Sequence, residues 1–448
     1  MNQLIKRQTI EFFKNETFLD IQSIRYRILE IIDEFNTKLV EREEVVRLLI
    51  LALYAKQNIF LFGEPGVSKT YMMRLLASLT GWRDYNINLA EINSPKEMIG
   101  TLENYYDKEH KSVLNCEIAL FDELFKAKES GILHSLLNII REKTITLEGK
   151  YLPLPLKMVI GASNEFPQGK ELEPFDDRFS MRYEVKRILN HDNFLNFWQE
   201  VYDKNLTFQT LITDEEIDET IRISRRVLDT QDVLLFILSL RERILAEKLK
   251  FSDRAFSDAK RILQISAILN GRYHLDISDA FLFNHIGWRE SNSKERINTI
   301  INNTVFGTSE ELEKFIIDLK TEKTRVDDLI QGNIFLALRY EYDIIHQDTF
   351  NAVVDKLSAI VKEYEQIISF LKAILYRRSM NKYVEKQIRN NIFIINYKDT
   401  AFKSKHLMDV RKILNNSTKK IKMIKAWIAE NENIMAYMNK KKAHSNEN

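Results

Sequence analysis

The feature that most constrains the fold is a short apolar run that leads into a glycine-bearing loop and then into a helix. Residues 58–62 read NIFLF, which is typical of a buried strand, and residues 63–70 read GEPGVSKT. Residues 69–80 form a helix candidate that Gly81 closes. A strand, such a loop and a helix in this order are typical of an α/β protein whose loop can surround a phosphate group.

Two more apolar runs of the same kind follow. Residues 118–121 read IALF and residues 157–162 read KMVIGA, with a helix candidate around residues 128–143 between them. Buried strands that alternate with helices indicate a parallel sheet. The chain is therefore predicted to contain a parallel α/β domain.

Proline and glycine divide the chain into two regions. All six prolines lie between Pro65 and Pro174, and eight of the 12 glycines lie between Gly63 and Gly169. These residues mark turns and strand ends, so the turn-rich part is confined to roughly the first 190 residues. The remainder is predicted to be largely helical.

Composition bounds the class of protein. At roughly 100–200 residues per domain, a chain of 448 residues suggests two to four domains. The single cysteine, Cys116, excludes an internal disulfide framework and a four-cysteine zinc site, which fits a reducing compartment. No run of about 18 apolar residues is present, and the first residues lack the apolar core of a signal peptide. We therefore expect a cytoplasmic protein without a transmembrane segment.

Charge is uneven along the chain. The formal net charge is only +1, but residues 371–448 carry 18 basic and 6 acidic side chains. Such a basic end could bind nucleic acid or anionic lipid, both of which attract clustered Lys and Arg. The commoner role of a charge run is a solvated helix face, which here would pair with acidic subunits of the same assembly. The residues leave these interpretations open.

The glycine-bearing loop has the side chains that nucleotide phosphates require. Its glycines let backbone N–H groups curl around phosphate oxygens, Lys69 supplies a positive charge to the β- and γ-phosphates, and Thr70 offers a hydroxyl to Mg²⁺. Ser68 stands where this motif has its second glycine, and serine is expected to fit only if the backbone there avoids a strongly left-handed conformation. The residues expected to contact the nucleotide are Gly63, Glu64, Pro65, Gly66, Val67, Ser68, Lys69, Thr70 and Tyr71.

Polar side chains follow the second and third apolar runs. Asp122 and Glu123 come directly after residues 118–121. In the crevice at the strand ends, Asp122 would hold Mg²⁺ and Glu123 would polarise the attacking water. Asn164 follows the third run, and its carboxamide could orient a water near the γ-phosphate. Taken singly, the two acids could be an ordinary helix N-terminus, and the asparagine could simply initiate a turn.

The order of these motifs resembles the AAA+ ATPase superfamily. GEPGVSKT, IALFDE, GASN and FDDRFSMR follow one another, and the match is closest to the MoxR family and, within it, to the RavA-like branch. The branch-level likeness lies in NSPKEMIG (93–100), ELFKAKESGILHSLLNIIREKTIT (123–146), ASNEFP (162–167) and SDRAF (252–256). The resemblance covers about residues 25–290 and is weak or absent beyond about residue 300. It implies a three-layer α/β/α sandwich with an all-helical lid, binding ATP and Mg²⁺.

The resemblance also assigns roles to single residues. Asn164 resembles sensor 1, and Arg178 resembles the arginine finger that reaches into a neighbouring subunit's nucleotide, with Arg182 as the fallback. Arg254 resembles sensor 2 on the helical lid. Residues 143–154 resemble the hairpin before sensor 1, and their alternating pattern independently indicates a strand and a turn.

An arginine that acts on a neighbour implies a closed head-to-tail ring, of six subunits by family analogy. Arg178 could instead form a plain ion pair with Asp176 or Asp177, and Arg254 could do so with Asp253. Residue type alone does not decide between these roles.

The resemblance and the helical spacing together predict four parts. These are an N-terminal helical extension (1–24), an AAA+ nucleotide-binding α/β domain (25–205), an AAA+ helical lid domain (206–290) and a mostly helical C-terminal domain with a basic end (291–448). In the last part, residues 310–323 and 353–375 are predicted to form long amphipathic helices, and residues 392–395 a strand or a buried helical turn. The small β-rich module of RavA-like proteins is expected to be missing or reduced.

The leading hypothesis is a Mg²⁺-dependent ATPase that assembles into a ring and remodels a partner protein. The MoxR resemblance implies a partner with a von Willebrand factor A domain. The first alternative is a nucleic-acid motor or a defence-system ATPase of the same fold that uses residues 371–448. The second is a nucleotide-gated scaffold that binds ATP without turnover. No signature for guanine is visible, so the resemblance favours ATP over GTP.

Overall fold

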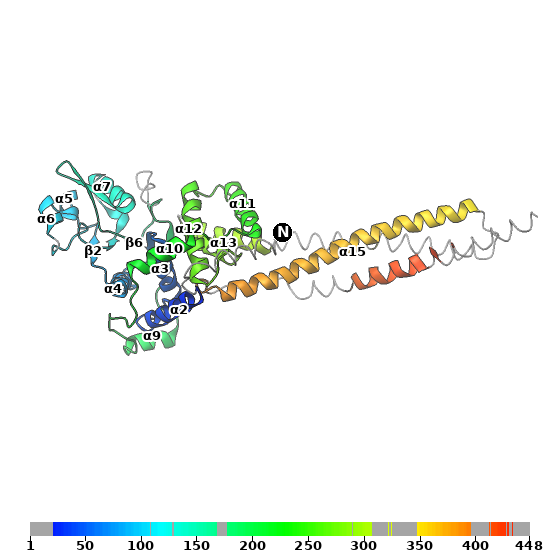
Figure 1. The fold of residues 1–448 in the computed structure, drawn as a ribbon, viewed down its shortest axis with the longest axis horizontal. Helices are drawn as coiled ribbons and strands as arrows, with labels where there is room; N and C mark the ends of the chain where they lie inside the picture. Colours follow the sequence, from blue (N-terminus) through cyan, green and yellow to red (C-terminus); the bar gives the residue numbers. More distant parts are fainter. Residues whose placement is uncertain are drawn as a thin grey trace, which may run out of the picture. The chain divides into compact units, whose positions relative to one another are not determined.

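The computed structural model describes most of the chain up to residue 306 and a large part of the chain beyond it (Figure 1). The described residues are 21–107, 109–127, 130–167, 177–288, 290–306, 321, 324, 347–395, 412, 414–426, 428–429 and 432. The chain divides into two compact units, the first within residues 1–305 and 386–397, the second within residues 306–385 and 398–448. Most of the predicted N-terminal extension, Asp176 and nearly all of the predicted helix at 310–323 lie outside the described residues. The division into four domains stays a prediction.

The first unit is built on a five-stranded sheet with the order β2-β3-β6-β1-β7. All of its neighbouring strands are parallel. The strands are β1 (Ile59–Phe62), β2 (Asp84–Asn88), β3 (Ile118–Asp122), β6 (Met158–Ser163) and β7 (Met181–Glu184). The three apolar runs of the sequence form the three central strands, and β6 is buried along its whole length. The predicted parallel α/β fold is confirmed.

Helices cover the sheet. On one face, Ile132, Leu136 and Ile139 of α7 (Ser130–Glu142) pack with Phe60 and Phe121 in one hydrophobic core. Strand residues of the opposite parity, such as Leu61 and Leu120, are also buried and point to the other face. There the sheet is contacted by α3 (Glu43–Ala55) and α4 (Lys69–Thr80). The helix α2 (Ile21–Thr37) packs on α3.

Shorter elements decorate this core. The helices α5 (Pro95–Ile99) and α6 (Leu102–Tyr106) precede β3, and η1 (Leu124–Lys126) follows it. The strands β4 (Thr144–Leu147) and β5 (Lys150–Pro153) form an antiparallel hairpin. Its turn residues Glu148 and Gly149 both have positive φ, at 48° and 76°. The strand and turn predicted at 143–154 are therefore present.

A helical region follows β7 within the same unit. After the short helix α9 (His191–Trp198) come α10 (Asp214–Ser224), α11 (Gln231–Ala246), α12 (Asp253–Leu269), η2 (Asp279–His285) and α13 (Ser291–Phe306). Ser and Thr cap α10, α11 and α12 through Thr213, Thr230 and Ser252, each accepting a backbone hydrogen bond inside the first turn. This region has the all-helical character that the lid prediction requires.

The long helix α15 (Gln347–Asn390) contains the predicted helix at 353–375. In the second unit its Leu357, Ile360, Val361 and Tyr364 pack against Ile421 and Ile424 of the C-terminal helix. Residues 392–395 form a turn rather than a strand, and Phe393 is buried within the first unit. Among the described residues, no helix combines the length and apolar character that crossing a bilayer requires.

Candidate nucleotide site

The carboxyl ends of three neighbouring strands meet at one edge of the sheet. In the sheet order β3, β6 and β1 are adjacent, and they end at Asp122, Ser163 and Phe62. The predicted loop follows β1, the predicted carboxylates close β3, and Asn164 follows β6. Ligands of parallel α/β sheets bind in the crevice beyond such ends. The structure brings the predicted loop, carboxylates and amide together.

Gly63 and Lys69 give the loop its shape. A Cβ on Gly63 would overlap the backbone carbonyl oxygen of Val185, so only glycine fits there. The buried Lys69 crosses the loop, and its Nζ donates a hydrogen bond to the Gly63 carbonyl at 2.8 Å. Burial lowers the pKa of Lys69, and the charges of Asp122 and Glu123 oppose that shift. The ammonium group therefore lies within electrostatic reach of both carboxylates.

The two carboxylates differ in their surroundings. Asp122 accepts a hydrogen bond from the backbone N–H of Glu123 at 3.0 Å. The side chain of Glu123 pairs with Lys126 at 3.1 Å, and Lys126 also lies 3.7 Å from Glu165. The ion pair with Glu123 raises the pKa of Lys126. Sequence reasoning did not find Lys126 or Glu165, because a lysine on a short helix and a glutamate after a strand form no motif.

Asn164 and Thr70 complete the polar edge. The Oδ1 atom of Asn164 is buried and has no hydrogen-bond partner among the described residues. Buried polar atoms in proteins are nearly always paired, so this oxygen is suited to a ligand or an ordered water. No described group of three His, Cys, Asp or Glu side chains could hold a metal. Thr70 and Asp122 nevertheless suit Mg²⁺, which is typically bound by one or two protein oxygens, substrate phosphates and water.

Ser68 corrects one expectation. The sequence predicted that serine fits only if the backbone avoids a strongly left-handed conformation, but Ser68 has φ 70° and ψ 22°. Its side chain forms no capping hydrogen bond to α4. The left-handed conformation costs an L-residue about 1–2 kcal/mol. Ser68 is therefore strained where the glycine of the motif would not be.

A cavity of about 360 Å³ adjoins the loop. Its wall consists of Lys38, Leu39, Val40, Arg42, Ser68, Tyr71, Ile188, Phe197, Tyr202 and Lys204. The size and the mixture of apolar, aromatic and basic side chains suit a nucleoside. Of these residues the sequence predicted only Ser68 and Tyr71. The others come from two segments, 38–42 and 188–204, that carry no motif and meet only through the fold.

Aromatic side chains dominate one side of this cavity. Phe197 and Tyr202 stack with ring centroids 5.8 Å apart and an interplanar angle of 8°. The buried hydroxyl of Tyr71 has no hydrogen-bond partner among the described residues. Burial raises the pKa of Tyr71 and lowers that of Arg42. A purine base could stack here and accept or donate hydrogen bonds at Tyr71.

Arg178 lies at the opposite edge of the sheet. Its carbonyl oxygen accepts a hydrogen bond from Nδ2 of Asn58 at 3.4 Å, and Asn58 directly precedes β1. The loop follows the other end of the same strand, about 13 Å away at 3.3 Å per residue. The Nε atom of Arg178 is buried without a hydrogen-bond partner in the described part of the chain. Arg178 and Lys69 thus occupy opposite ends of β1.

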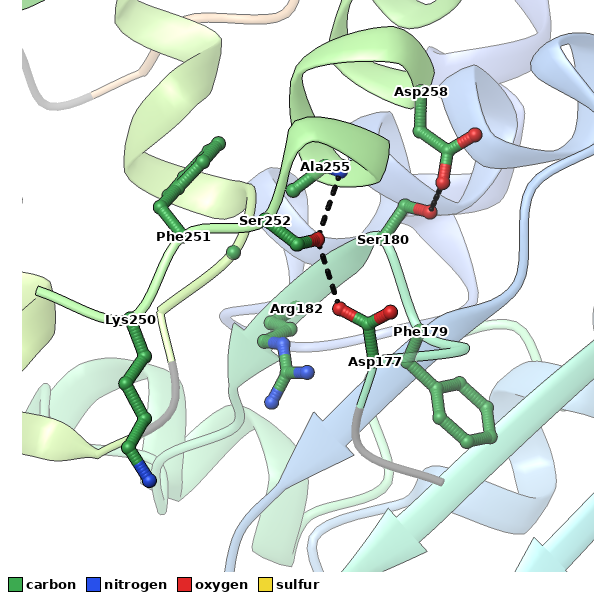
Figure 2. Close-up of a pocket in the computed structure, with 10 residues that line it drawn as sticks. Asp177, Phe179, Ser180, Arg182, Lys250, Phe251, Ser252, Ala255 and Asp258 are labelled. Carbon is green, nitrogen blue, oxygen red and sulfur yellow. Dashed lines mark hydrogen bonds between the residues drawn. The ribbon is translucent and has the colours of Figure 1, made fainter. Parts of the chain in front are cut away.

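Arg254 lies beside Arg178, and their shared partner Asp177 lines the pocket drawn in Figure 2. Asp177 pairs with Arg254 at 3.0 Å and with Arg178 at 3.8 Å. Ser252, which caps α12, also donates a hydrogen bond to Asp177 at 2.9 Å. Burial lowers the pKa of Arg178, and the charge of Arg254 lowers it further. The structure therefore brings the two predicted arginines to each other and places Arg178 far from the loop.

Arg182 does not suit its fallback role. It lies in β7, only 1% of its surface is exposed, and its guanidinium lies over the ring of Phe60 at 5.9 Å. A side chain enclosed in this way cannot reach a neighbouring subunit. The expectation that Arg182 could replace Arg178 is wrong, because strand alternation directs it into the interior.

Family models match both parts of the first unit. Residues 26–221 match a MoxR domain described from ternary systems of MoxR, vWA and β-propeller proteins. Residues 232–301 match an AAA lid domain. The two matches cover more than half of the chain. The chain belongs to the MoxR family of AAA+ ATPases. The narrower RavA-like branch stays a prediction.

Relatives extend the likeness of this MoxR-type chain. An uncharacterized protein of Methanocaldococcus jannaschii is 25% identical over 390 residues, which is 85% of this chain and 94% of that protein. A match of this length must include part of the helical region beyond residue 301, where the family models end. The chaperone MoxR1 of Mycobacterium tuberculosis is 24% identical over 161 residues, covering 34% of this chain and 42% of that one.

A solved structure agrees with the fold. The crystal structure of a Cytophaga hutchinsonii protein assigned as an ATPase superposes with a TM-score of 0.53 at 20% identity. The likeness covers 65% of this chain and 96% of that chain. At this identity it supports the AAA+ architecture alone.

Proposed function

We propose that this MoxR-type chain is a Mg²⁺-dependent ATPase that works as a head-to-tail ring and remodels a partner protein. The observation that carries the proposal is the division of the candidate site. Lys69, Asp122 and Glu123 lie at one edge of the sheet, whereas Arg178 and Arg254 lie at the opposite edge. One copy holds the nucleotide, and the next copy supplies the arginines.

Each side chain at the loop edge has a task in this proposal. Lys69 neutralises phosphate charge, and Thr70 with Asp122 would hold a Mg²⁺ ion, which would supply positive charge to the transferred phosphoryl group. Glu123 accepts a proton from the attacking water, and Asn164 orients that water through its unpartnered oxygen. The cavity of about 360 Å³ takes the nucleoside.

The arginine edge acts across the subunit boundary. A fixed guanidinium stabilises the transition state of phosphoryl transfer, and supplying it from a neighbour typically contributes 10³–10⁵ in rate. Asp177 holds Arg254 and lies close to Arg178. We propose that both arginines act on the neighbour's nucleotide and that Asp177 positions them. Family analogy suggests six copies in the ring.

Mixing two inactive variants tests this proposal. Lys69→Ala removes the nucleotide half and Arg178→Ala removes the arginine half, so each alone should lose ATP hydrolysis. In an equimolar mixture, about one quarter of the interfaces pair an intact loop with an intact arginine, so up to about one quarter of wild-type activity should return. No recovery, although the two variants assemble together, would refute action in trans.

Glu123→Gln separates an enzyme from a scaffold. We expect this variant to bind ATP and to lose hydrolysis, because the amide cannot accept a proton from water. Equal, negligible rates for the wild type and Glu123→Gln would support the scaffold instead. The slow variant also serves as a trap for the partner, and we propose a vWA-domain protein, as in the ternary systems of the matched family. Hydrolysis that polynucleotides stimulate in a salt-dependent way would favour a nucleic-acid motor.

A further inference from the structure

Helix α9 presents an apolar surface to solvent. None of its eight residues is buried. The exposed apolar side chains on this helix and its two flanks are Leu189, Phe194, Leu195, Phe197, Trp198 and Val201, and Trp198 keeps 74% of its surface exposed. We call these residues the α9 surface. Large apolar side chains exposed together on one short segment usually mark an interaction site.

Polar bonds, rather than burial, hold α9 in place. The carboxylate of Glu41 accepts hydrogen bonds from the backbone N–H groups of Leu189 and Asn190, both at 2.8 Å, and from Nδ2 of Asn193 at 3.0 Å. Burial by itself would raise the pKa of Glu41, but these hydrogen bonds outweigh burial, and the pKa is lowered overall. The helix is thereby fixed beside the cavity, to which it contributes Phe197. The α9 surface therefore has a defined position next to the cavity.

Helix α11 has apolar side chains on two sides. Val233, Phe236, Leu240 and Ile244 are buried, as the core-facing side of a lid helix should be. The leucines of the other side, which we call the α11 surface, remain 53–58% exposed and are Leu234, Leu235, Leu238 and Leu245. The same side also carries the exposed Arg241 and Glu242, so this helix is apolar on its buried side and mixed on its exposed side. Four leucines exposed on one helix exceed the scattered apolar residues of an ordinary surface, which suits an interaction site with a polar rim.

The α9 surface adjoins the loop half of the divided site, and helix α11 precedes the arginine half along the chain. The α9 surface adjoins the cavity, which Ser68 and Tyr71 also line. The segment between α11 and Arg254 contains Lys250 and Phe251. Lys250 and Phe251 line the pocket beside Asp177 (Figure 2). In Figure 1, α9 lies at the bottom of the first unit and α11 at its top. One copy cannot bring the two surfaces together.

We propose that the α9 surface of one copy packs against the α11 surface of the next copy. This inference rests on the proposed function, because it names the interface that delivers Arg178 and Arg254 to a neighbour's nucleotide. Two different surfaces on opposite sides give a heterologous contact, which closes into a ring when the rotation allows. A stable protein–protein interface buries about 800 Å² on each partner and has an apolar centre. The α9 and α11 surfaces would supply that centre.

Cysteine cross-linking tests the contact directly. Cys116 is the natural cysteine and is buried, so engineered cysteines provide the reactive thiols. Trp198→Cys and Leu238→Cys are made as separate proteins and treated with a short bis-maleimide in the presence of ATP. We expect covalent dimers in the mixture and none with either variant alone. Dimers of one variant with itself would overturn the heterologous contact. Tyr26→Cys, at an exposed position on α2, is the matched control and should not cross-link to Trp198→Cys.

A charge substitution gives a second readout. Leu238→Glu places a charge in the apolar contact, so we expect a lower oligomer mass with ATP and at least tenfold slower hydrolysis. Binding of a fluorescent ATP analogue should stay unchanged, because the loop and the cavity lie within one copy. Tyr26→Glu adds the same charge outside both surfaces and should leave mass and rate unchanged.

The two hypotheses fail in different ways. A wild-type protein that forms rings and hydrolyses ATP, while Trp198→Cys and Leu238→Cys do not cross-link, would overturn the α9–α11 contact and leave the proposed function intact. A wild-type protein that binds ATP but neither assembles nor hydrolyses it would overturn the proposed function itself.

Discussion

Replacing Ser68 by glycine should stabilise the protein. Ser68 has φ 70°, a conformation that costs an L-residue about 1–2 kcal/mol, and its side chain makes no capping bond that the change would remove. Glycine also increases the conformational entropy of the unfolded chain, which reduces the stabilisation by about 0.5–1 kcal/mol. The expected net effect is a stabilisation of about 0.5–1 kcal/mol.

The assay is urea unfolding without nucleotide, followed by circular dichroism, with the midpoint and slope compared between variants. Glu148→Gly is the matched control, because Glu148 has φ 48° in the β4–β5 turn, away from the loop. It should stabilise by a similar amount and leave nucleotide affinity unchanged. Gly66→Ala should destabilise the protein, because Gly66 has φ 82°, which alanine adopts only with strain. An added Cβ would meet nothing within 4 Å, so this effect reports backbone strain alone.

A second measurement connects this strain to the site. Ser68 lines the cavity, and glycine there leaves more room for the ligand, so Ser68→Gly should hydrolyse ATP at least as fast as the wild type. The reasoning would be refuted if Ser68→Gly were neutral or destabilising while Glu148→Gly stabilised. The Ser68 hydroxyl would then form a stabilising interaction larger than the backbone strain.

Three further substitutions have defined outcomes. Val40→Trp should fill part of the cavity of about 360 Å³ and abolish binding of a fluorescent ATP analogue, with little change in the unfolding midpoint. Gly63→Ala should destabilise by at least about 2 kcal/mol in urea, because the new Cβ meets the rigid backbone of Val185. Burial lowers the pKa of Lys143 from 10.5 to about 7, and its Nζ donates to Asn58 at 3.0 Å. The unfolded chain then binds the extra proton between pH 7 and about 10.5, so stability should rise with pH there, by up to about 1.4 kcal/mol per unit, and Lys143→Met should lack this rise.

Local patterns made much of the fold and the loop predictable. The strands β1, β3 and β6 are short apolar runs bounded by turn residues, and their order with helices admits few topologies. Lys69, Asp122 and Asn164 follow these strands directly, so the parallel sheet alone brings them to one edge. Such positions can be inferred because each depends on a strand end and not on a distant contact.

The remaining parts of the site depend on contacts that no pattern records. The cavity is closed by residues around Val40 and Phe197, which lie about 160 residues apart along the chain and have no shared spacing. The place of Arg254 beside Asp177 depends on how α12 docks against the segment before β7. Arg182 was expected as the fallback for Arg178, yet Arg182 lies within β7 and is buried, whereas Arg178 lies before that strand. Only the tertiary arrangement distinguishes them.

Positive φ values at non-glycine residues are unusual in their position at the loop edge. Among the described residues with positive φ other than glycine, Lys56, Lys143, Glu200 and Lys248 all lie at helix C-terminal ends, where the left-handed conformation is ordinary.

Ser68 and Glu123 differ, because each stands immediately before a helix, has φ near 60° and forms no capping bond. Residues at that position normally adopt the extended region. Both lie at the edge that holds Lys69 and Asp122, and the further positive-φ residue Glu41 (φ 53°) lies before α3. Strained backbone persists where the surrounding structure enforces it, typically at ligand sites. Ser68→Gly relieves this strain. If the variant still hydrolyses ATP, the strain belongs to the loop geometry and phosphoryl transfer does not require it.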